Sequence, residues 1–198
     1  PNIGNLDEGS DLACNTWDII SGNTNIEDDV ILYDDNGAFA GLQTAEMIAN
    51  KGSKLEIITP ERFFSPEVGG MNYVPYAKTF IEKNVKITID KRIKRIKKRG
   101  NRLLVSIGSD YSNILENLET SQVIIEHGTL PLDDLYFELK QKSYNLGAID
   151  YNSLIKNKFI ELKNNKEGSY FLYRVGDAIS SRNIHAAIYD SLRICNHL

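Results

Sequence analysis

Cysteine, methionine and tryptophan are scarce in this chain of 198 residues, and long apolar runs are absent. Its two cysteines, Cys14 and Cys195, lie far apart and match neither a CxxC motif nor a metal-binding spacing. So few cysteines argue against a disulfide framework and predict a reducing, cytoplasmic location. No apolar stretch approaches the roughly 20 residues that a membrane-spanning helix needs, so we expect no membrane partner.

An excess of positive charge is also absent, because the net charge is -4. This balance argues against nucleic acid or an anionic membrane as the main partner. The one strongly basic segment, KRIKRIKKRGNR at residues 91–102, contains isoleucines at 93 and 96 and a Gly-Asn pair at 100–101. We therefore interpret it as a solvated β-hairpin and not as a nucleic-acid site.

Groupings typical of catalysis are missing as well. His127 and His185 have no cysteine or carboxylate at metal-ligand spacing, and no Ser-His-Asp or Cys-His arrangement is recognisable. The sequence therefore predicts no catalytic residue and no metal ligand within this chain.

The clearest structural signal is the segment VILYDDNGAFAGLQTAEMIA at residues 30–49. Its first four residues are almost entirely apolar, as in a parallel strand covered on both faces. A Gly-containing turn follows, then a helix that ends at Gly52, then a second strand at 53–61. The order strand, helix, strand predicts one right-handed crossover unit and an α/β fold.

Beyond this unit the pattern predicts a helix at 73–84 and an antiparallel hairpin over 85–109, turning at residues 100–101. Another apolar strand is predicted within 121–131. After Pro131 the composition becomes polar and irregular, with one helix predicted around 134–142. The last part predicts a strand before Gly176, then a helix from about Asn183 with Ser180 or Ser181 as its cap.

The turn after the first apolar strand resembles a degenerate dinucleotide fingerprint. Asp35 stands where G-x-G-x-x-A has its first glycine, whereas Gly37 and Ala40 meet the second and third requirements. Two hypotheses stay open: a βαβ unit capped by its own acid, or a working dinucleotide site. A carboxylate here would occupy the N–H donors of the turn and repel a diphosphate by roughly 1–4 kcal/mol at about 4 Å. The candidate cofactor-binding residues are Gly37, Ala38, Phe39, Ala40 and, as the acid that would bind a ribose, Glu61.

A second candidate site is the pair Gly176 and Asp177. A glycine after a strand permits close approach of a backbone or a ligand, and Asp177 would stand where doubly wound folds bind ligands. The alternative is a plain turn that connects a strand to the last helix.

Four segments together resemble the C-terminal region of the old yellow enzyme class of NADH:flavin oxidoreductases, closest to trimethylamine dehydrogenase and related amine demethylases. These segments are TWDIISG, VILYDDNGAFAGLQTAEMIANKG, LEIITPE and RVGDAISSRNIHAAIYDSLR. The resemblance implies a Rossmann-like small domain of the glutathione reductase type with a β-hairpin, plus part of a second nucleotide-binding domain. Residues 26–130 would form the NAD(P)H-binding-like domain, and residues 1–25 and 131–198 would belong to the FAD/ADP-binding-like domain.

The same resemblance implies cofactors and partners. FMN and a 4Fe-4S cluster would sit in an N-terminal barrel domain that precedes this chain, which itself begins at Pro1. Gly176 and Asp177 would face FAD or ADP, whereas NAD(P)H binding does not carry over to the Asp35 turn, where the first glycine is missing. An electron-transfer flavoprotein and a homodimer are the partners implied.

The predicted function is therefore the nucleotide-binding-like portion of a flavin-dependent enzyme that oxidatively demethylates N-methylated amines, not catalytic by itself. Two alternatives remain: an NAD(P)H-dependent reductase of enoyl or dienoyl substrates, and a non-catalytic docking module.

Overall fold

The computed structural model describes residues 6, 8–156, 158 and 161–196, and the chain divides into two compact units. Unit 1 comprises residues 1–128 and unit 2 comprises residues 129–198. The boundary lies close to the predicted one at 130. The described part of residues 1–25, a segment predicted to belong to the larger domain, lies in unit 1. The cofactor type of each domain stays a prediction.

Unit 1 is built on a five-stranded parallel sheet in the order β1-β8-β2-β3-β4. Its strands are β1 (Cys14–Asn15), β2 (Asp29–Asp34), β3 (Lys54–Ile58), β4 (Lys86–Thr88) and β8 (Gln122–Glu126). The chain moves from β2 outwards through β3 to β4, while β8 and β1 lie on the other side of β2. The order therefore reverses between β2 and β8, and such a reversal is where open α/β sheets bind ligands.

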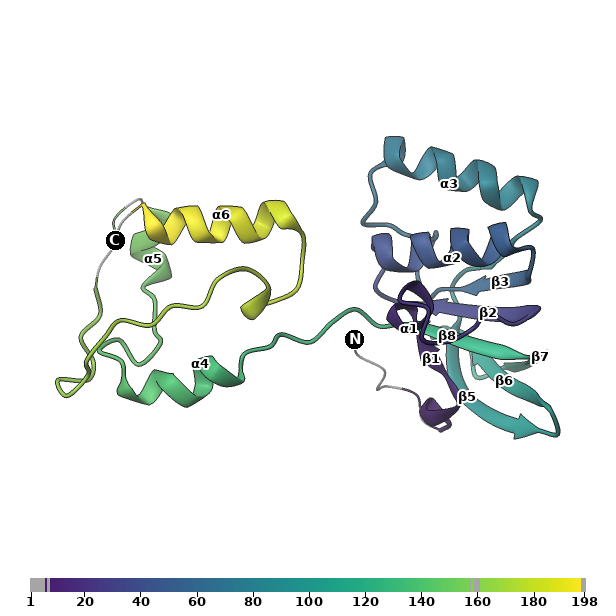
Figure 1. Cartoon of the computed structure of the whole chain (residues 1–198), viewed down its shortest axis with the longest axis horizontal. Coiled ribbons are helices and arrows are strands. Elements are labelled where there is room, and N and C mark those ends of the chain that lie inside the picture. The colour runs from purple at the N-terminus through teal and green to yellow at the C-terminus, as the bar shows by residue number, and fades with distance from the viewer. Residues whose placement is uncertain (1–5, 7, 157, 159–160, 197–198) are drawn as a thin grey trace. The chain divides into compact units, whose positions relative to one another are not determined.

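One face of this sheet carries α1 (Thr16–Ile20), α2 (Phe39–Lys51) and α3 (Gly70–Glu82) (Figure 1). Apolar side chains of α2 and the sheet form a core here, including Leu42, Ile48 and Ile57, all with no exposed surface. Gly52 takes a left-handed conformation and ends α2 as predicted.

The other face packs on a three-stranded antiparallel sheet of β5 (Arg92–Arg99), β6 (Arg102–Gly108) and β7 (Leu115–Thr120). A second core lies between the two sheets and includes Ile31, Ile96 and Val105. The predicted hairpin and its turn at residues 100–101 are confirmed, and its basic side chains are mostly paired with acids.

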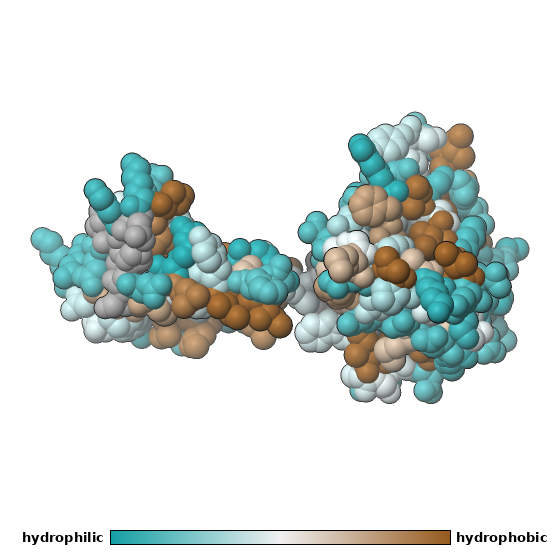
Figure 2. Space-filling model, turned by 90° about the horizontal axis from the view of Figure 1, so that it is seen from above, coloured by the Kyte–Doolittle hydropathy of each residue, from teal (hydrophilic) through white to brown (hydrophobic). Residues whose placement is uncertain are grey.

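Unit 2 holds α4 (Asp134–Leu139), α5 (Tyr151–Ile155) and α6 (Ile184–Cys195), together with short 3-10 turns at Lys140–Lys142 and Gly176–Ala178. Among its described residues, Leu154 and Ile194 are the only buried hydrophobic side chains. In Figure 2, hydrophobic surface runs along α6, where Ile184, Ile188 and Leu192 are spaced four residues apart and each is at least half exposed.

Three sequence predictions about local structure are wrong. Residues 86–88 do not begin the hairpin but form β4 beside β3, since alternation alone does not tell which sheet a strand joins. The segment before Gly176 forms no regular strand, because unit 2 offers it a single bridge, between Ser143 and Tyr170, in the part that the structure describes. Asn183, and neither Ser180 nor Ser181, caps α6 by accepting from the Ala186 N–H at 2.9 Å.

Candidate functional site at the carboxyl edge of the parallel sheet

The candidate site lies where β2 and β8 end side by side. Asp34 and Glu126 are register partners on these two parallel strands, so both carboxyl groups stand at the same edge. Thr16, at the start of α1, reaches the same edge through a hydrogen bond to Glu126. This edge lies between β2 and β8, where the strand order of the sheet reverses, and a dinucleotide-binding fold binds its ligand at such a position.

Asp34 caps the turn that follows β2. Its Oδ1 accepts the N–H of Asn36 at 2.9 Å and that of Gly37 at 2.8 Å. The side chain is wholly buried, and burial raises its pKa to about 7 despite these two hydrogen bonds, with Glu126 and Asp35 adding to the rise. The self-capping hypothesis assigned this role to Asp35. The structure gives it to Asp34, because Asp34 is the residue whose side chain points to the helix face of the sheet.

The backbone of Gly37 is covered by the loop after β3 and is not open to a ligand. It adopts φ +70°, and a Cβ on it would lie 2.7 Å from Pro66 Cδ. The Gly37 carbonyl accepts the N–H of Glu67 at 3.1 Å, so the loop after β3 is held against the turn. On the other side, a Cβ at Gly41 of α2 would lie 2.1 Å from Asp34 Oδ2. The backbone at which a diphosphate would approach is therefore in contact with protein on both sides.

Glu126 is the second buried acidic side chain of the edge. Its Oε1 accepts from the Gly128 N–H at 2.8 Å and from Asn36 Nδ2 at 3.3 Å, and its Oε2 accepts from the Thr16 hydroxyl. Gly128 has φ +72°, and a Cβ on it would lie 2.9 Å from Asn36 Oδ1. The turns after β2 and β8 are thus bonded to each other through one buried carboxylate.

Asp35 turns towards the antiparallel sheet, away from Asp34. Its Oδ1 lies 2.7 Å from His127 Nδ1, and its Oδ2 accepts from the Tyr33 hydroxyl at 3.4 Å and lies 4.0 Å from Arg92 Nη1. Burial, together with the negative charge of Asp35, raises the pKa of Tyr33. Asp34 Oδ2 and His127 Nε2 are buried atoms without a hydrogen-bond partner in the described part of the chain.

The remaining predicted residues of this motif are only partly brought together. Ala38 is the N-cap residue of α2 and makes no side-chain cap, Phe39 is 44% exposed, and the Ala40 carbonyl accepts from the Thr44 hydroxyl. Glu61 is exposed in the loop after β3. In the described residues no hydrogen bond joins its side chain to the Gly37 turn.

Gly176 and Asp177 lie in unit 2, in a 3-10 turn and not at the end of a strand. Gly176 is buried with φ +58°, and a Cβ on it would lie 3.0 Å from the Ala187 Cβ of α6. Its N–H donates to Asp190 Oδ2 at 3.3 Å. The close approach that this glycine permits is therefore made by α6, whereas Asp177 is exposed.

The carboxyl edge of unit 1 does not suit a dinucleotide diphosphate. The donors of the two turns are occupied by Asp34 and Glu126, and three carboxyl groups stand where negative charge would have to enter. Among the residues with described placement, no three His, Cys, Asp or Glu side chains are grouped as a metal site would require. Within the described part of the chain, no helix is long and apolar enough to span a membrane.

Sequence reasoning missed Glu126 and Thr16. The signal for Glu126 was available, because it directly follows the apolar strand QVII just as Asp34 follows VILY. Carboxyl ends of parallel strands meet at one edge, so two acids in this position predict a shared site. Thr16 and Pro66 carry no such signal, because their places depend on how α1 and a loop pack.

The chain is similar to two curated amine-oxidising proteins over nearly its whole length. It is 44% identical to a probable N-methylproline demethylase of Rhizobium meliloti over 98% of this chain, and 34% identical to an N,N-dimethylglycine/sarcosine dehydrogenase of Chromohalobacter salexigens over 96%. The resemblance to amine demethylases is thereby confirmed. The chain spans 29% and 28% of the length of these two relatives. No family model matches it.

Solved structures confirm the mixed α/β fold of the chain. Histamine dehydrogenase from Rhizobium sp. 4-9 matches all of this chain and 28% of its own, with a TM-score of 0.69 at 16% identity. An HOCl-induced flavoprotein disulfide reductase from Escherichia coli, in its Cu(II) complex, matches 90% of this chain and 38% of its own, with a TM-score of 0.56 at 17% identity. The mixed α/β fold predicted from the sequence is thus also present in this dehydrogenase and in this flavoprotein reductase.

Proposed function

We propose that this chain is the nucleotide-binding-like part of a flavin-dependent oxidoreductase that removes methyl groups from N-methylated amino acids. The support comes from the two relatives, both of which are named for such substrates. In the oxidation, the amine loses a hydride equivalent and a proton to an acceptor, and water then releases formaldehyde. No residue of this chain takes part in that step.

Unit 1 acts in this proposal as a structural domain that binds no pyridine nucleotide. The observation that carries it is the pair Asp34 and Glu126, which together accept from the N–H groups of Asn36, Gly37 and Gly128. Electrons would then leave the enzyme through an electron-transfer flavoprotein. Gly176 and Asp177 are proposed to face an ADP or FAD moiety in the larger domain, with the exposed Asp177 carboxylate towards the ligand.

The experiment has two parts, the first on the chain and the second on the longer enzyme. Calorimetric titration of the chain with NADH and NADPH should give no binding at millimolar coenzyme. Replacing Asp34 by Ala should create measurable affinity for pyrophosphate, since two backbone N–H donors lose their internal acceptor. The matched control is Asp28→Ala, because Asp28 is exposed and outside the turn. Submillimolar binding of NADH by the unaltered chain would contradict the proposal.

The enzyme that contains this chain should release formaldehyde from N-methylproline or sarcosine with an artificial electron acceptor and without NAD+. NADH-dependent reduction of an enoyl substrate would instead establish the alternative, a reductase. Binding of ADP but not NADH would support the assignment of Gly176 and Asp177.

A further inference from the structure

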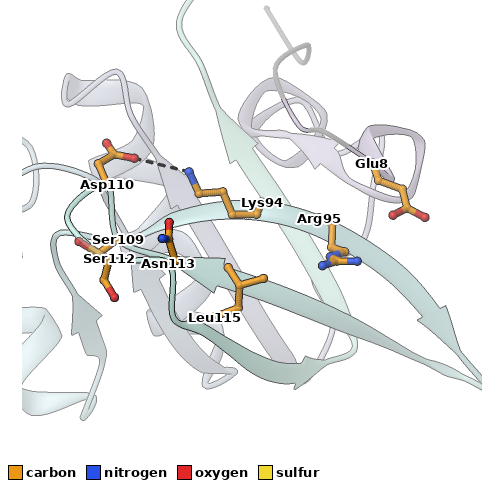
Figure 3. Close-up of a pocket in the computed structure, with 8 residues that line it drawn as sticks. All are labelled: Glu8, Lys94, Arg95, Ser109, Asp110, Ser112, Asn113 and Leu115. Atoms are coloured by element: carbon orange, nitrogen blue, oxygen red, sulfur yellow. Dashed lines mark hydrogen bonds and ion pairs between the residues drawn. The ribbon is translucent and has the colours of Figure 1, made fainter.

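A polar cavity of about 600 Å³ opens on the antiparallel sheet of unit 1. It is lined by Glu8, Lys94, Arg95, Ser109, Asp110, Ser112, Asn113 and Leu115 (Figure 3). Its size falls within the range of several hundred cubic ångströms that small-molecule sites occupy. The N-terminal segment forms one side, where the Glu8 carbonyl accepts the Ile96 N–H at 2.9 Å.

An irregularity in β5 aims two cations into this cavity. The register with β6 shifts between Ile93 and Arg95, so Lys94 is an extra residue in the strand. A bulge of this kind breaks the strict alternation of faces and redirects side chains. Lys94 and Arg95, although adjacent in sequence, therefore both line the cavity. Gly108 on β6 permits the close approach of Leu115, since a Cβ there would lie 2.9 Å from Leu115 Cδ2.

The two carboxylates that line the cavity are each already paired with a cation. Asp110 is bound by Arg92 at 2.7 Å and by Lys94 at 3.5 Å, while Glu8 is paired with Lys97 at 3.4 Å. Arg92 lowers the pKa of Asp110, so this carboxylate stays ionised and neutralised.

Of the two cations that line the cavity, Lys94 is paired with Asp110 and Arg95 forms no ion pair among the described residues. Its half-buried guanidinium has no hydrogen bond or ion pair within the described residues. In the view of Figure 3, Lys94 extends towards Asp110, whereas Arg95 lies nearer Glu8, with Leu115 between the two ends. A partly buried cation that forms no ion pair and faces a cavity favours an anion there.

The loop between β6 and β7 adds neutral donors. The hydroxyl oxygens of Ser109 and Ser112 accept the N–H groups of Tyr111 at 3.2 Å and Ile114 at 3.1 Å. Their hydroxyl protons therefore remain available for a ligand, as does the amide of Asn113. Several donors around one forked cation suit a phosphate group, which offers more acceptor oxygens than a carboxylate.

We propose that this cavity binds a phosphate-bearing small molecule, with the phosphate at Arg95 and Lys94 and the remainder of the molecule over Leu115. The site does not depend on the proposed demethylase activity, although Arg92 connects its Asp110 to Asp35 of the carboxyl edge.

The test is a titration of the whole chain with inorganic phosphate and with AMP, followed by calorimetry and by amide chemical shifts of residues 92–115, at constant ionic strength set with chloride. Both probes should bind, AMP more tightly than phosphate. Arg95→Gln should weaken binding roughly tenfold or more, as expected for loss of a hydrogen bond to a charged group. Lys98→Gln is the matched control, since it removes the same charge from an exposed position of β5 outside the cavity, and it should change affinity less than twofold.

A citrate titration separates the ligand classes. Citrate binding equal to that of AMP would overturn the assignment to phosphate, and equal effects of Arg95→Gln and Lys98→Gln would reduce the site to a general attraction of anions. Absence of shifts in residues 92–115 at millimolar phosphate and AMP would overturn the proposal altogether.

Discussion

Asp34 lies at the end of β2 with its carboxyl group buried, one oxygen bonded to two backbone N–H groups and the other without a partner. Such a group is stabilised more when protonated than when charged, because burial costs the anion its hydration. Two carboxyl groups nearby, Glu126 and Asp35, act in the same direction. Protonation of Asp34 near neutral pH is therefore part of the normal state of this edge.

The consequence is a loss of stability as pH rises. The pKa of Asp34 is about 7 in the folded chain against 3.8 for the ordinary group. Its contribution to the free energy of unfolding is complete below pH 4 and is lost between about pH 4 and pH 7, by at most roughly 4 kcal/mol. Asp34→Asn keeps the acceptor oxygen but cannot ionise, so its stability should be flatter with pH and no lower than that of the unaltered chain at pH 8.

The measurement is urea unfolding at several pH values, monitored by the fluorescence of Trp17. Trp17 is the single tryptophan and lies in unit 1, so the signal reports the free energy of unfolding of that unit. Asp28→Asn, at an exposed position, is the control and should follow the unaltered chain at every pH. Parallel profiles for Asp34→Asn and the unaltered chain would contradict the buried-acid explanation.

At the scale of elements, α2 docks on β2 through the contact of Gly41 with Asp34. Alanine normally favours a helix over glycine, yet a Cβ at Gly41 would lie 2.1 Å from Asp34 Oδ2. Gly41→Ala should therefore destabilise unit 1 by roughly 1–3 kcal/mol through overpacking. In an Asp34→Ala background the same substitution should cost much less, and a double-mutant cycle by urea unfolding measures the difference. Additive effects would show that the two residues do not interact.

The elements of unit 1 were largely predictable from the sequence, because their signals are local. A continuous apolar run predicts β2, a left-handed glycine ends α2, and alternation around residues 100–101 predicts the hairpin. The strand expected before Gly176 was not found, since a strand requires a neighbour that the local sequence does not reveal. The sequence predicted where the site lies, at the turn that contains Gly37, but not which acid caps this turn. The capping acid is Asp34. Which side chain faces α2 depends on the register of β2 in the sheet, and the local sequence does not determine that register.

At the scale of the whole molecule, the two units differ in how much apolar surface each buries. Unit 1 has two apolar cores, one on each face of its parallel sheet. Unit 2 buries Leu154 and Ile194 among its described residues and exposes a stripe along α6. Burial of apolar surface is the main favourable term in folding, so unit 1 should carry nearly all the cooperative stability of the chain.

A chain shortened to residues 1–128 should accordingly unfold at the same urea concentration as the whole chain when Trp17 fluorescence is monitored. Hydrogen exchange of the whole chain should be slow in β2, β3 and β8 and fast in the described residues of unit 2. A large drop in the midpoint after shortening would contradict this division. So would strong protection of the α6 amides.

The positions of Asp34 and Glu126 also determine how readily substitutions could restore coenzyme binding to this edge. Asp34 accepts the N–H of Gly37, Glu126 accepts the N–H of Gly128, and Pro66 packs against Gly37. Removing Asp34 alone would free two amides for a diphosphate, but Glu126 and Pro66 would still restrict the place where a whole coenzyme would lie. Each single change would also leave buried amides without an acceptor, so a chain altered stepwise towards coenzyme binding would pass through forms that are less stable than the present one.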